Sequence, residues 1–525
     1  MKYTYLSLMM AFTSFIHAGI RPADGLWGTS DDPAIGSGLM LTTQNNITVV
    51  SVFTYDQTGK NTWYLASGEV NDEGVLEAEL RQTQNGANII SENPAAAEFI
   101  EQTRTLKLEF TGTQIGTISI GGSEPKSMQA MHFGFYSQPT EQLLLADGTK
   151  YRFPSIDGEW VLGDPESGES YVLNLTNYGT GASPPSPNFS LAFLSNHPTT
   201  DNWQIFCPQR ITSSVQPYCR VFRRGNDPSF SEMRIDLQDL GNQRMTVYQN
   251  DVEPFESYQA FRLNKDRRLL PNDGYWRAYD DPDIGSGLVM RTQGDFTVVL
   301  IYTYDDEGLP IWQIASGRFD EGGKFSADLL TATGGTAIES NAPNSASFEA
   351  EKHTLIIQIQ GLELATFSID DSEPKTMQNY NFGVELFETE HFLVEGQPLK
   401  FPGQAGTWAV ADYTIENIRP GALEIFEESG AVTPLPPTEP LLYSGFHPSE
   451  IYLNSFGFTF DCHRKVINDE IMPSCDGAFN GEDFLTDTRV YFEDIGYDRF
   501  RLYVDPPSYI GRDSYYLDFF RLSDY

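Results

Sequence analysis

The sequence is poor in cysteine and in positive charge, and after its first residues it has no long apolar run. It contains 34 Lys and Arg against 73 Asp and Glu, which gives a net charge of −39. Such an excess repels the phosphates of nucleic acids and anionic membrane surfaces, so we expect neither as a partner. No later segment has the roughly 20 apolar residues of a membrane helix, so no membrane insertion is expected. Aromatic residues are not scarce: at 13% aromatic and 40% hydrophobic, the chain can build packed cores, which argues against disorder.

Motifs of the common enzyme classes are also missing. There is no Gly-x-Ser-x-Gly elbow, His-Glu-x-x-His zinc motif, Gly-Lys-Ser/Thr phosphate loop or EF-hand spacing. Only His197 and His447 match between the two halves of the chain, and a His-Pro pair is more typical of a turn than of a catalytic base. We therefore predict no catalytic residue. A hydrolase with paired carboxylates stays open, because acidic residues are too abundant for a pair to stand out.

The first 18 residues have the pattern of a secretory signal. Lys2 is positive, residues 5–15 are mostly apolar, and Ala18 is the small residue expected at a cleavage site. This pattern predicts a secreted or periplasmic protein.

Four cysteines form two close pairs, Cys207 with Cys219 and Cys462 with Cys475. In an exported protein, such pairs at matching places predict two local disulfides. A zinc site is the weaker interpretation, because C-x-x-C spacing and neighbouring histidines are missing.

The sequence repeats itself with an offset of 249 residues, as between Trp27 and Trp276. The same offset relates the strings Asp-Gly-x-Trp, Ile-Gly-Ser-Gly-Leu, Thr-Tyr-Asp and Ser-Glu-Pro-Lys, which begin at residues 24, 35, 54 and 123 of the first copy. A second, looser repeat ends on Phe-Arg-Leu at 261–263 and at 520–522. We therefore predict a signal at 1–18 and four modules in A-B-A-B order, namely A1 (22–153), B1 (156–265), A2 (271–402) and B2 (404–525).

The fold class predicted for all four modules is all-β, an antiparallel meander closed as a barrel or folded as a sandwich. Residues 48–55 and 297–304 are β-branched and aromatic runs that end in Asp-x-x-Gly turns, and each continues into a second strand. Residues 95–102 and 345–352 are expected to be short helical insertions. Sequential hairpins in a unit of this size favour the meander.

Tryptophans and aspartates supply the candidate ligand sites. The four Gly-x-Trp tryptophans, at 27, 160, 276 and 408, are expected to fill cores. Rings just past a hairpin turn would instead lie at an open rim and could stack on a sugar, unless they form a buried cross-strand pair. The rim site would consist of Trp63, Tyr64 and Asp56 in A1 and of Trp312, Tyr304 and Asp305 in A2.

Two Asp-Asp-Pro turns are the candidate cation sites, although such turns also occur without a metal. Their carboxylates are Asp31 and Asp32 in A1 and Asp280 and Asp281 in A2, and calcium is the ion that they would hold. No other cofactor is expected. The neighbouring Gly-Ser-Gly is followed by a strand rather than a helix, which argues against a nucleotide loop.

The A modules resemble a repeat found in many exported proteobacterial proteins of unassigned activity. Its pattern is Gly-x-Trp, then Asp-Pro-x-x-Gly-Ser-Gly-Leu, then Tyr-Thr-Tyr-Asp-x-x-Gly-x-Pro-x-Trp, and A2 carries it at residues 274–276, 281–288 and 302–312. A1 departs from it at Phe53 and Asn61. The resemblance implies an exported β-rich module and supplies no reaction.

The function predicted from these features is that of an exported, non-enzymatic binding or surface-interaction protein. Two similar halves in one monomer suit a repetitive ligand such as a polysaccharide, since linked sites gain avidity. The alternatives are the hydrolase and a structural component of the envelope or extracellular matrix.

Overall fold

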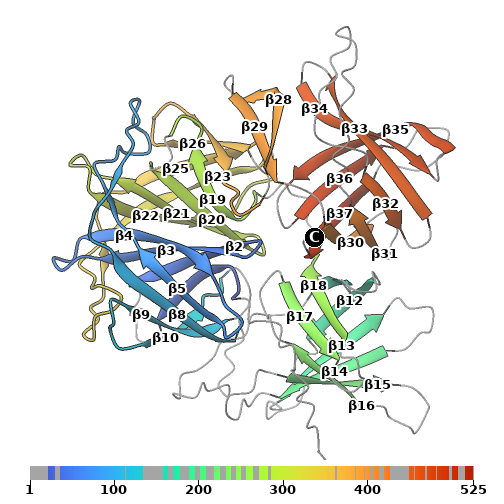
Figure 1. Ribbon diagram of the computed structural model, residues 1–525, viewed down its shortest axis with the longest axis horizontal. Coiled ribbons are helices and arrows are strands. Elements are labelled where there is room, and N and C mark those ends of the chain that lie inside the picture. Colours follow the sequence, from blue (N-terminus) through green and yellow to red (C-terminus); the bar gives the residue numbers. More distant parts are fainter. Residues whose placement is uncertain are drawn as a thin grey trace, which may run out of the picture.

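The computed structural model describes residues 22–29, 36–112, 114–133, 271–281, 285–360 and 364–384, together with the strands of the remaining modules. The signal region, residues 1–18, lies outside this part of the chain. All regular structure in the described part is β (Figure 1), as predicted. It contains no helix that is long and apolar enough to cross a membrane.

Module A1 is an antiparallel sheet of eight strands in the order β4-β3-β2-β1-β10-β9-β8-β5. Mutual backbone hydrogen bonds between Leu65 and Arg81, of 2.9 and 2.8 Å, join its two edges into a barrel. The strands are β1 (Gly25–Thr29), β2 (Gly38–Gln44), β3 (Ile47–Tyr55), β4 (Asn61–Glu69), β5 (Val75–Leu80), β8 (Arg104–Gly112), β9 (Ile115–Ile120) and β10 (Lys126–Ala130), with the small pair β6 (Thr83–Gln84) and β7 (Glu98–Phe99) beside them.

Module A2 has the corresponding strand order, β22-β21-β20-β19-β27-β26-β25-β23, and pairing of β22 with β23 closes it. Trp27 faces Ala130 in A1, and Trp276 faces Asn379 in A2, so the 249-residue offset also relates the registers. Its strands are β19 (Gly274–Ala278), β20 (Gly287–Gln293), β21 (Phe296–Tyr304), β22 (Pro310–Gly317), β23 (Lys324–Thr333), β24 (Ser347–Phe348), β25 (His353–Ile359), β26 (Leu364–Ile369) and β27 (Lys375–Asn379).

Module B1 is a closed barrel in which each strand pairs with the next. Its strands are β11 (Gly158–Gly163), β12 (Ser170–Asn177), β13 (Asn188–Ser195), β14 (Asn202–Pro208), β15 (Tyr218–Arg224), β16 (Glu232–Leu237), β17 (Arg244–Gln249) and β18 (Glu256–Arg262).

Module B2 is an eight-stranded sheet in the order β31-β30-β37-β36-β35-β34-β33-β32, and the hairpin of β28 (Leu386–Val394) and β29 (Gln397–Pro402) precedes it. Phe261 of B1 stacks on Phe520 of B2 with ring centroids 5.3 Å apart. The strands are β30 (Gly406–Asp412), β31 (Arg419–Ile425), β32 (Ser449–Leu453), β33 (Phe456–Ile467), β34 (Glu470–Phe479), β35 (Glu482–Ile495), β36 (Arg499–Asp505) and β37 (Tyr515–Ser523).

The Gly-x-Trp tryptophans are core residues, as predicted, since Trp27, Trp160, Trp276 and Trp408 are fully buried. In the A modules each indole donates to a backbone carbonyl four residues upstream, Trp27 to Ala23 and Trp276 to Asn272. The buried indole N–H is thereby satisfied within its own module.

The prediction of short helices at 95–102 and 345–352 is wrong. Both segments are extended and include β7 and β24, which pair with Thr83–Gln84 and with the end of β23. Ala97 and Ala346 are buried in a hydrophobic cluster that contains residues of both A modules. Inter-module packing and edge pairing therefore override the local helical preference of these alanines.

Candidate functional site: the seam between the A modules

Modules A1 and A2 meet along a continuous interface, here called the seam. It joins β3, β4 and the segment 85–97 (arm 1) of A1 to β21, β22 and the segment 334–346 (arm 2) of A2 (Figure 1). The centre of the seam is aromatic. Trp63 makes edge-to-face contacts with Tyr302 and Tyr304, with ring centroids 5.3 and 5.8 Å apart. Trp312 makes the same kind of contact with Phe53 and Tyr55, with ring centroids 6.1 and 5.9 Å apart.

The two seam tryptophans bond across the interface in the same way. Trp63 Nε1 donates to the carbonyl of Thr303 at 3.1 Å, and Trp312 Nε1 donates to the carbonyl of Thr54 at 3.0 Å. Trp63 is 1% exposed and Trp312 is 4% exposed. Neither ring is accessible for stacking on a sugar in the paired modules, so the prediction of both as ligand contacts is wrong. The apolar rings lie past a hairpin turn, as expected, but a second module covers that rim.

Each arm carries an isoleucine into the core of the other barrel. Ile89 of A1 belongs to the core of A2, and Ile338 of A2 belongs to the core of A1. The arm backbone is held by threonine hydroxyls: Ile89 N–H donates to Thr303 Oγ1 at 2.8 Å, and Ile338 N–H donates to Thr54 Oγ1 at 2.9 Å. Each barrel core is thus completed by the other module.

Serine and lysine side chains of the repeated motifs hold the rest of each arm. Ser37 Oγ donates to the carbonyl of Thr336 at 2.9 Å, and Ser286 Oγ donates to that of Ala87 at 2.6 Å. Lys375 Nζ likewise donates to the carbonyl of Ser91 at 2.6 Å. The equivalent lysine, Lys126, bonds the carbonyl of Ser340. The Gly-Ser-Gly and Ser-Glu-Pro-Lys strings therefore bind the opposite arm.

A glycine at the start of each arm permits a close approach of backbone to ring. A Cβ on Gly86 would lie 2.1 Å from Tyr304, and one on Gly335 would lie 2.3 Å from Tyr55. Any larger residue would push the arm away from the tyrosine that it crosses.

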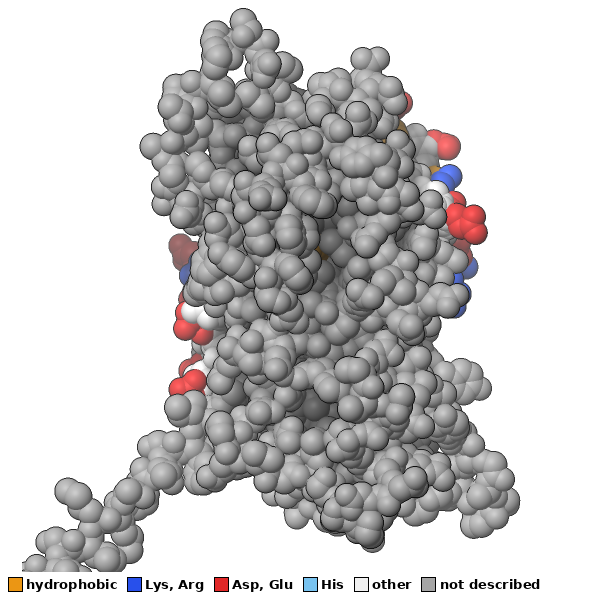
Figure 2. All heavy atoms as spheres, turned by 90° about the vertical axis from the view of Figure 1, so that its right-hand side faces the viewer, with side chains coloured by type: hydrophobic (Ala, Val, Ile, Leu, Met, Phe, Trp, Pro, Cys, Tyr) orange, Lys and Arg blue, Asp and Glu red, His pale blue; other side chains and the backbone are white. Residues whose placement is uncertain are grey.

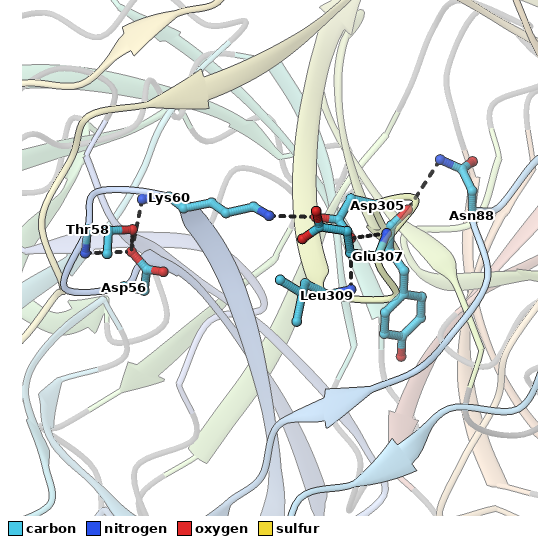
Figure 3. Close-up of polar contacts among 8 residues, drawn as sticks. Asp56, Thr58, Lys60, Asn88, Asp305, Glu307 and Leu309 are labelled. Carbon is cyan, nitrogen blue, oxygen red and sulfur yellow. Dashed lines mark hydrogen bonds and ion pairs between the residues drawn. The ribbon is translucent and has the colours of Figure 1, made fainter.

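The rim aspartates serve the turns and the seam (Figure 3). Asp56 Oδ1 accepts from Thr58 N at 2.7 Å and Lys60 N at 3.0 Å, and Asp305 Oδ1 accepts from Leu309 N at 2.9 Å. Partial burial opposes ionisation of both carboxyls, but hydrogen bonds outweigh it and lower the pKa of each. For Asp56 they come first from the Thr58 hydroxyl, and for Asp305 first from Lys60. Lys60 Nζ crosses the seam to Asp305 Oδ2 at 2.5 Å.

The two tyrosines proposed for the rim are also occupied by packing. Tyr304 is fully buried, and its hydroxyl lies 2.8 Å from Thr83 Oγ1. Tyr64 packs against the A1 core, and burial raises the pKa of its hydroxyl. Four of the six rim residues therefore belong to the seam, whereas Tyr64 packs on the A1 core and Asp56 closes its own turn. The six do not form one open ligand site.

Of the candidate cation sites, only the A2 turn is described, since Asp31 and Asp32 lie outside the described residues. Asp280 Oδ2 is 3.2 Å from Lys375 Nζ. Burial, and then the charge of Asp280, raise the pKa of Asp281 to about 7. Within the described part of the chain, no group of three or more Asp, Glu, His or Cys side chains is placed to hold a metal ion.

The cysteines lie on neighbouring strands, although their side chains are outside the described part. Cys462 on β33 is the direct register partner of Cys475 on β34. Cys207 on β14 is one residue beyond the pair of Phe206 with Arg220, and Cys219 precedes Arg220 on β15. The two disulfides therefore stay predictions.

Comparison of the chain with protein-family models, with curated proteins and with solved structures finds no match.

The sequence interpretation missed the two arm isoleucines. One signal was present: Gly86 and Gly335 share the 249-residue offset, and both arms continue to an Ala-x-Ile or Ala-Ile sequence. Nothing local in that signal shows that the isoleucine enters another module, because an isolated apolar residue in a loop has no periodicity to indicate its partner.

Proposed function

We propose that the protein is an exported, non-enzymatic binding or surface-interaction protein built on a rigid pair of A modules. One observation carries the proposal. The residues that the two A copies share, namely the motif serines, threonines, tryptophans and lysines, are used to join the copies. The internal repetition is then explained by architecture, and it needs no repeated reaction centre.

Exposed rings at equivalent places are our candidates for ligand contact. Phe99 on β7 is 43% exposed and Phe348 on β24 is 39% exposed, and they are related by the 249-residue offset. The guanidinium of Arg81 lies 5.4 Å from the Phe99 ring centre. Flat exposed rings of this kind suit the apolar face of a sugar, and two linked sites suit a polysaccharide.

Several further predictions belong to this proposal. They are the A-B-A-B duplication, the kinship of the A modules with the exported proteobacterial repeat, the signal at residues 1–18, the disulfides and the secreted or periplasmic location. Figure 2 shows described acidic and basic side chains together on the flanks of the molecule, where charge favours solubility. The negative balance of the whole chain supports a basic, cationic or uncharged ligand.

A glycan array with the mature protein, with and without calcium, tests the proposal. We expect binding to a polymeric glycan that falls at least about tenfold in the double variant Phe99→Ala/Phe348→Ala and less in either single variant. Leu309→Ala is the matched control, because Leu309 is also exposed, at 42%. Unchanged binding in the double variant would refute the two rings, and turnover of a bound glycan would favour the hydrolase instead.

A further inference from the structure

Neither A module completes its core by itself. The A2 core includes Ile89 from A1, and the A1 core includes Ile338 from A2. We call the part of each core that surrounds the isoleucine of the other module its socket. Each module therefore carries both a socket and the arm that fills the socket of its partner. The serine and threonine hydroxyls that line each socket bond the arm backbone, at 2.6 to 2.9 Å.

The central contacts of the seam are reciprocal. The tryptophan bonds, the threonine–isoleucine bonds and the serine bonds each occur once in either direction. At the far end of the seam, Phe382 N–H donates to Gln44 Oε1 at 2.6 Å, and Phe133 N–H donates to Gln293 Oε1 at 2.7 Å. Such self-complementary pairing is the geometry of an isologous protein interface.

The covalent connection between A1 and A2 does not require the two modules to pair within one chain. The whole of B1, from β11 to β18, lies between the two modules in the sequence. The atoms that A1 contacts are the same whether A2 comes from its own chain or from a second copy. Exchange of an identical element between protomers is a low-cost route to association.

Two ion pairs distinguish A1–A2 pairing from pairing of like modules. Lys60 meets Asp305, and the residue equivalent to Lys60 in A2 is Leu309. Arg104 meets Glu339, and the residue equivalent to Glu339 in A1 is Ile90. An A2–A2 pair would therefore lack the lysine, and an A1–A1 pair would lack the glutamate. These differences favour unlike modules.

We propose that the seam is also an intermolecular recognition surface, and that its partner is a second copy of this chain. When A1 cannot pair within its own chain, it binds A2 of another copy through the same arm and socket contacts. This proposal goes beyond the ligand-binding function and does not depend on it.

A complementation experiment with full-length chains tests the proposal. In Ile89→Asp, arm 1 is defective and arm 2 is intact; in Ile338→Asp, the reverse holds. Each chain alone has one defective arm in its internal seam. A mixed pair can form one intact seam, between A1 of the Ile338→Asp chain and A2 of the Ile89→Asp chain. We expect each variant alone to remain monomeric and the equimolar mixture to double its molar mass in light scattering, with both chains in the complex by native mass spectrometry.

The adjacent residue provides the control. Ile90 is 36% exposed, so Ile90→Asp should keep its own seam and should not associate with Ile338→Asp. Near-ultraviolet circular dichroism checks that the variants are folded, and the milder pair Ile89→Ala and Ile338→Ala replaces them if they are not. In either variant alone, every A1–A2 seam keeps a defective arm, whether it forms within or between chains. Stable dimers of one variant that match the mixed complex in affinity would therefore overturn the A1–A2 preference. A mixture of folded variants that stays monomeric would overturn the proposal.

Discussion

The two A modules present equivalent residues to each other, but the edges of their interface differ. At the centre, each tryptophan donates to a carbonyl in the other module, and each threonine accepts an arm amide. At the edges, A1 supplies Lys60 and Arg104 where A2 has Leu309 and His353. His353 instead pairs with Asp370 of its own module at 2.7 Å.

The contacts that stabilise the A1–A2 pair therefore differ from those that select the partner module. The shared central contacts are buried and reciprocal, so they contribute most of the stabilisation. The edge ion pairs are partly exposed, with side-chain exposures of 43% and 22% for Lys60 and Asp305. Exposed ion pairs contribute little free energy, yet they distinguish one partner from another.

The largest expected effect comes from the seam tryptophans. Trp63→Ala and Trp312→Ala should each destabilise the A pair by about 3–5 kcal/mol, because each leaves a large cavity. Denaturant unfolding followed by the remaining tryptophan fluorescence measures the loss. Since the two rings have equivalent surroundings, their losses should agree within about 1 kcal/mol. A near-wild-type transition for either variant would show that its ring is not enclosed by the seam.

Reduction of the disulfides should destabilise the B modules and leave the stability of the A modules unchanged. All four cysteines belong to B1 and B2, and each predicted disulfide contributes roughly 3 kcal/mol. A thiol reductant should lower the unfolding transition of the B modules and leave that of the A pair in place. Non-reducing peptide mapping should find Cys207 with Cys219 and Cys462 with Cys475. A link between the halves, or four free thiols, would contradict the pairing.

Removal of one arm-binding hydroxyl should have an intermediate effect. Thr54→Val and Thr303→Val keep the shape of the side chain but leave the amide of Ile338 or Ile89 without its acceptor. The cost should be about 1–3 kcal/mol for each variant. Thermal unfolding compares the two, and Thr58→Val, at an exposed turn position, is the control. A loss in only one of the two would show that the arms are not equivalent.

The pH dependence of the stability of A2 should reflect the titration of Asp281. Its pKa is raised to about 7 in the folded state from an ordinary value of 3.8, so the protonated form favours folding. The stabilisation is complete below pH 3.8 and is lost as the pH rises to about 7. Asp281→Asn should remove this dependence and should stabilise A2 at pH 8 by about 1–2 kcal/mol. Unfolding measured between pH 4 and pH 8 checks it, and parallel curves for variant and wild type would refute it.

The smallest effect should come from the edge of the seam. Lys60→Met removes the ion pair with Asp305 and should cost under about 1 kcal/mol, with a difference that shrinks in high salt. Urea titrations at low and high salt measure it. A large, salt-independent loss would mean that Lys60 acts through the packing of its stem instead.

Much of the local structure could be predicted from the sequence alone. The β-branched runs, the Asp-x-x-Gly turns and the Gly-x-Trp motifs predicted the hairpins and the core positions of Trp27 and Trp276, since residue type and near neighbours decide these features. The helical prediction at residues 95–102 failed because Ala95, Ala96 and Ala97 have a high intrinsic helix propensity that the seam overrides.

Only the tertiary structure decided what the repeated residues do. A tryptophan after a turn has the same sequence pattern whether it faces solvent or another module, so Trp63 and Trp312 could be assigned only once the modules were paired. Ile89 and Ile338 likewise enter cores whose other residues lie at least 187 positions away in the sequence, the separation of Ile89 from Trp276. The local sequence pattern indicates the secondary structure and which face of a strand is buried. The contacts between modules depend instead on the shape and hydrogen bonding of two surfaces that exist only after folding.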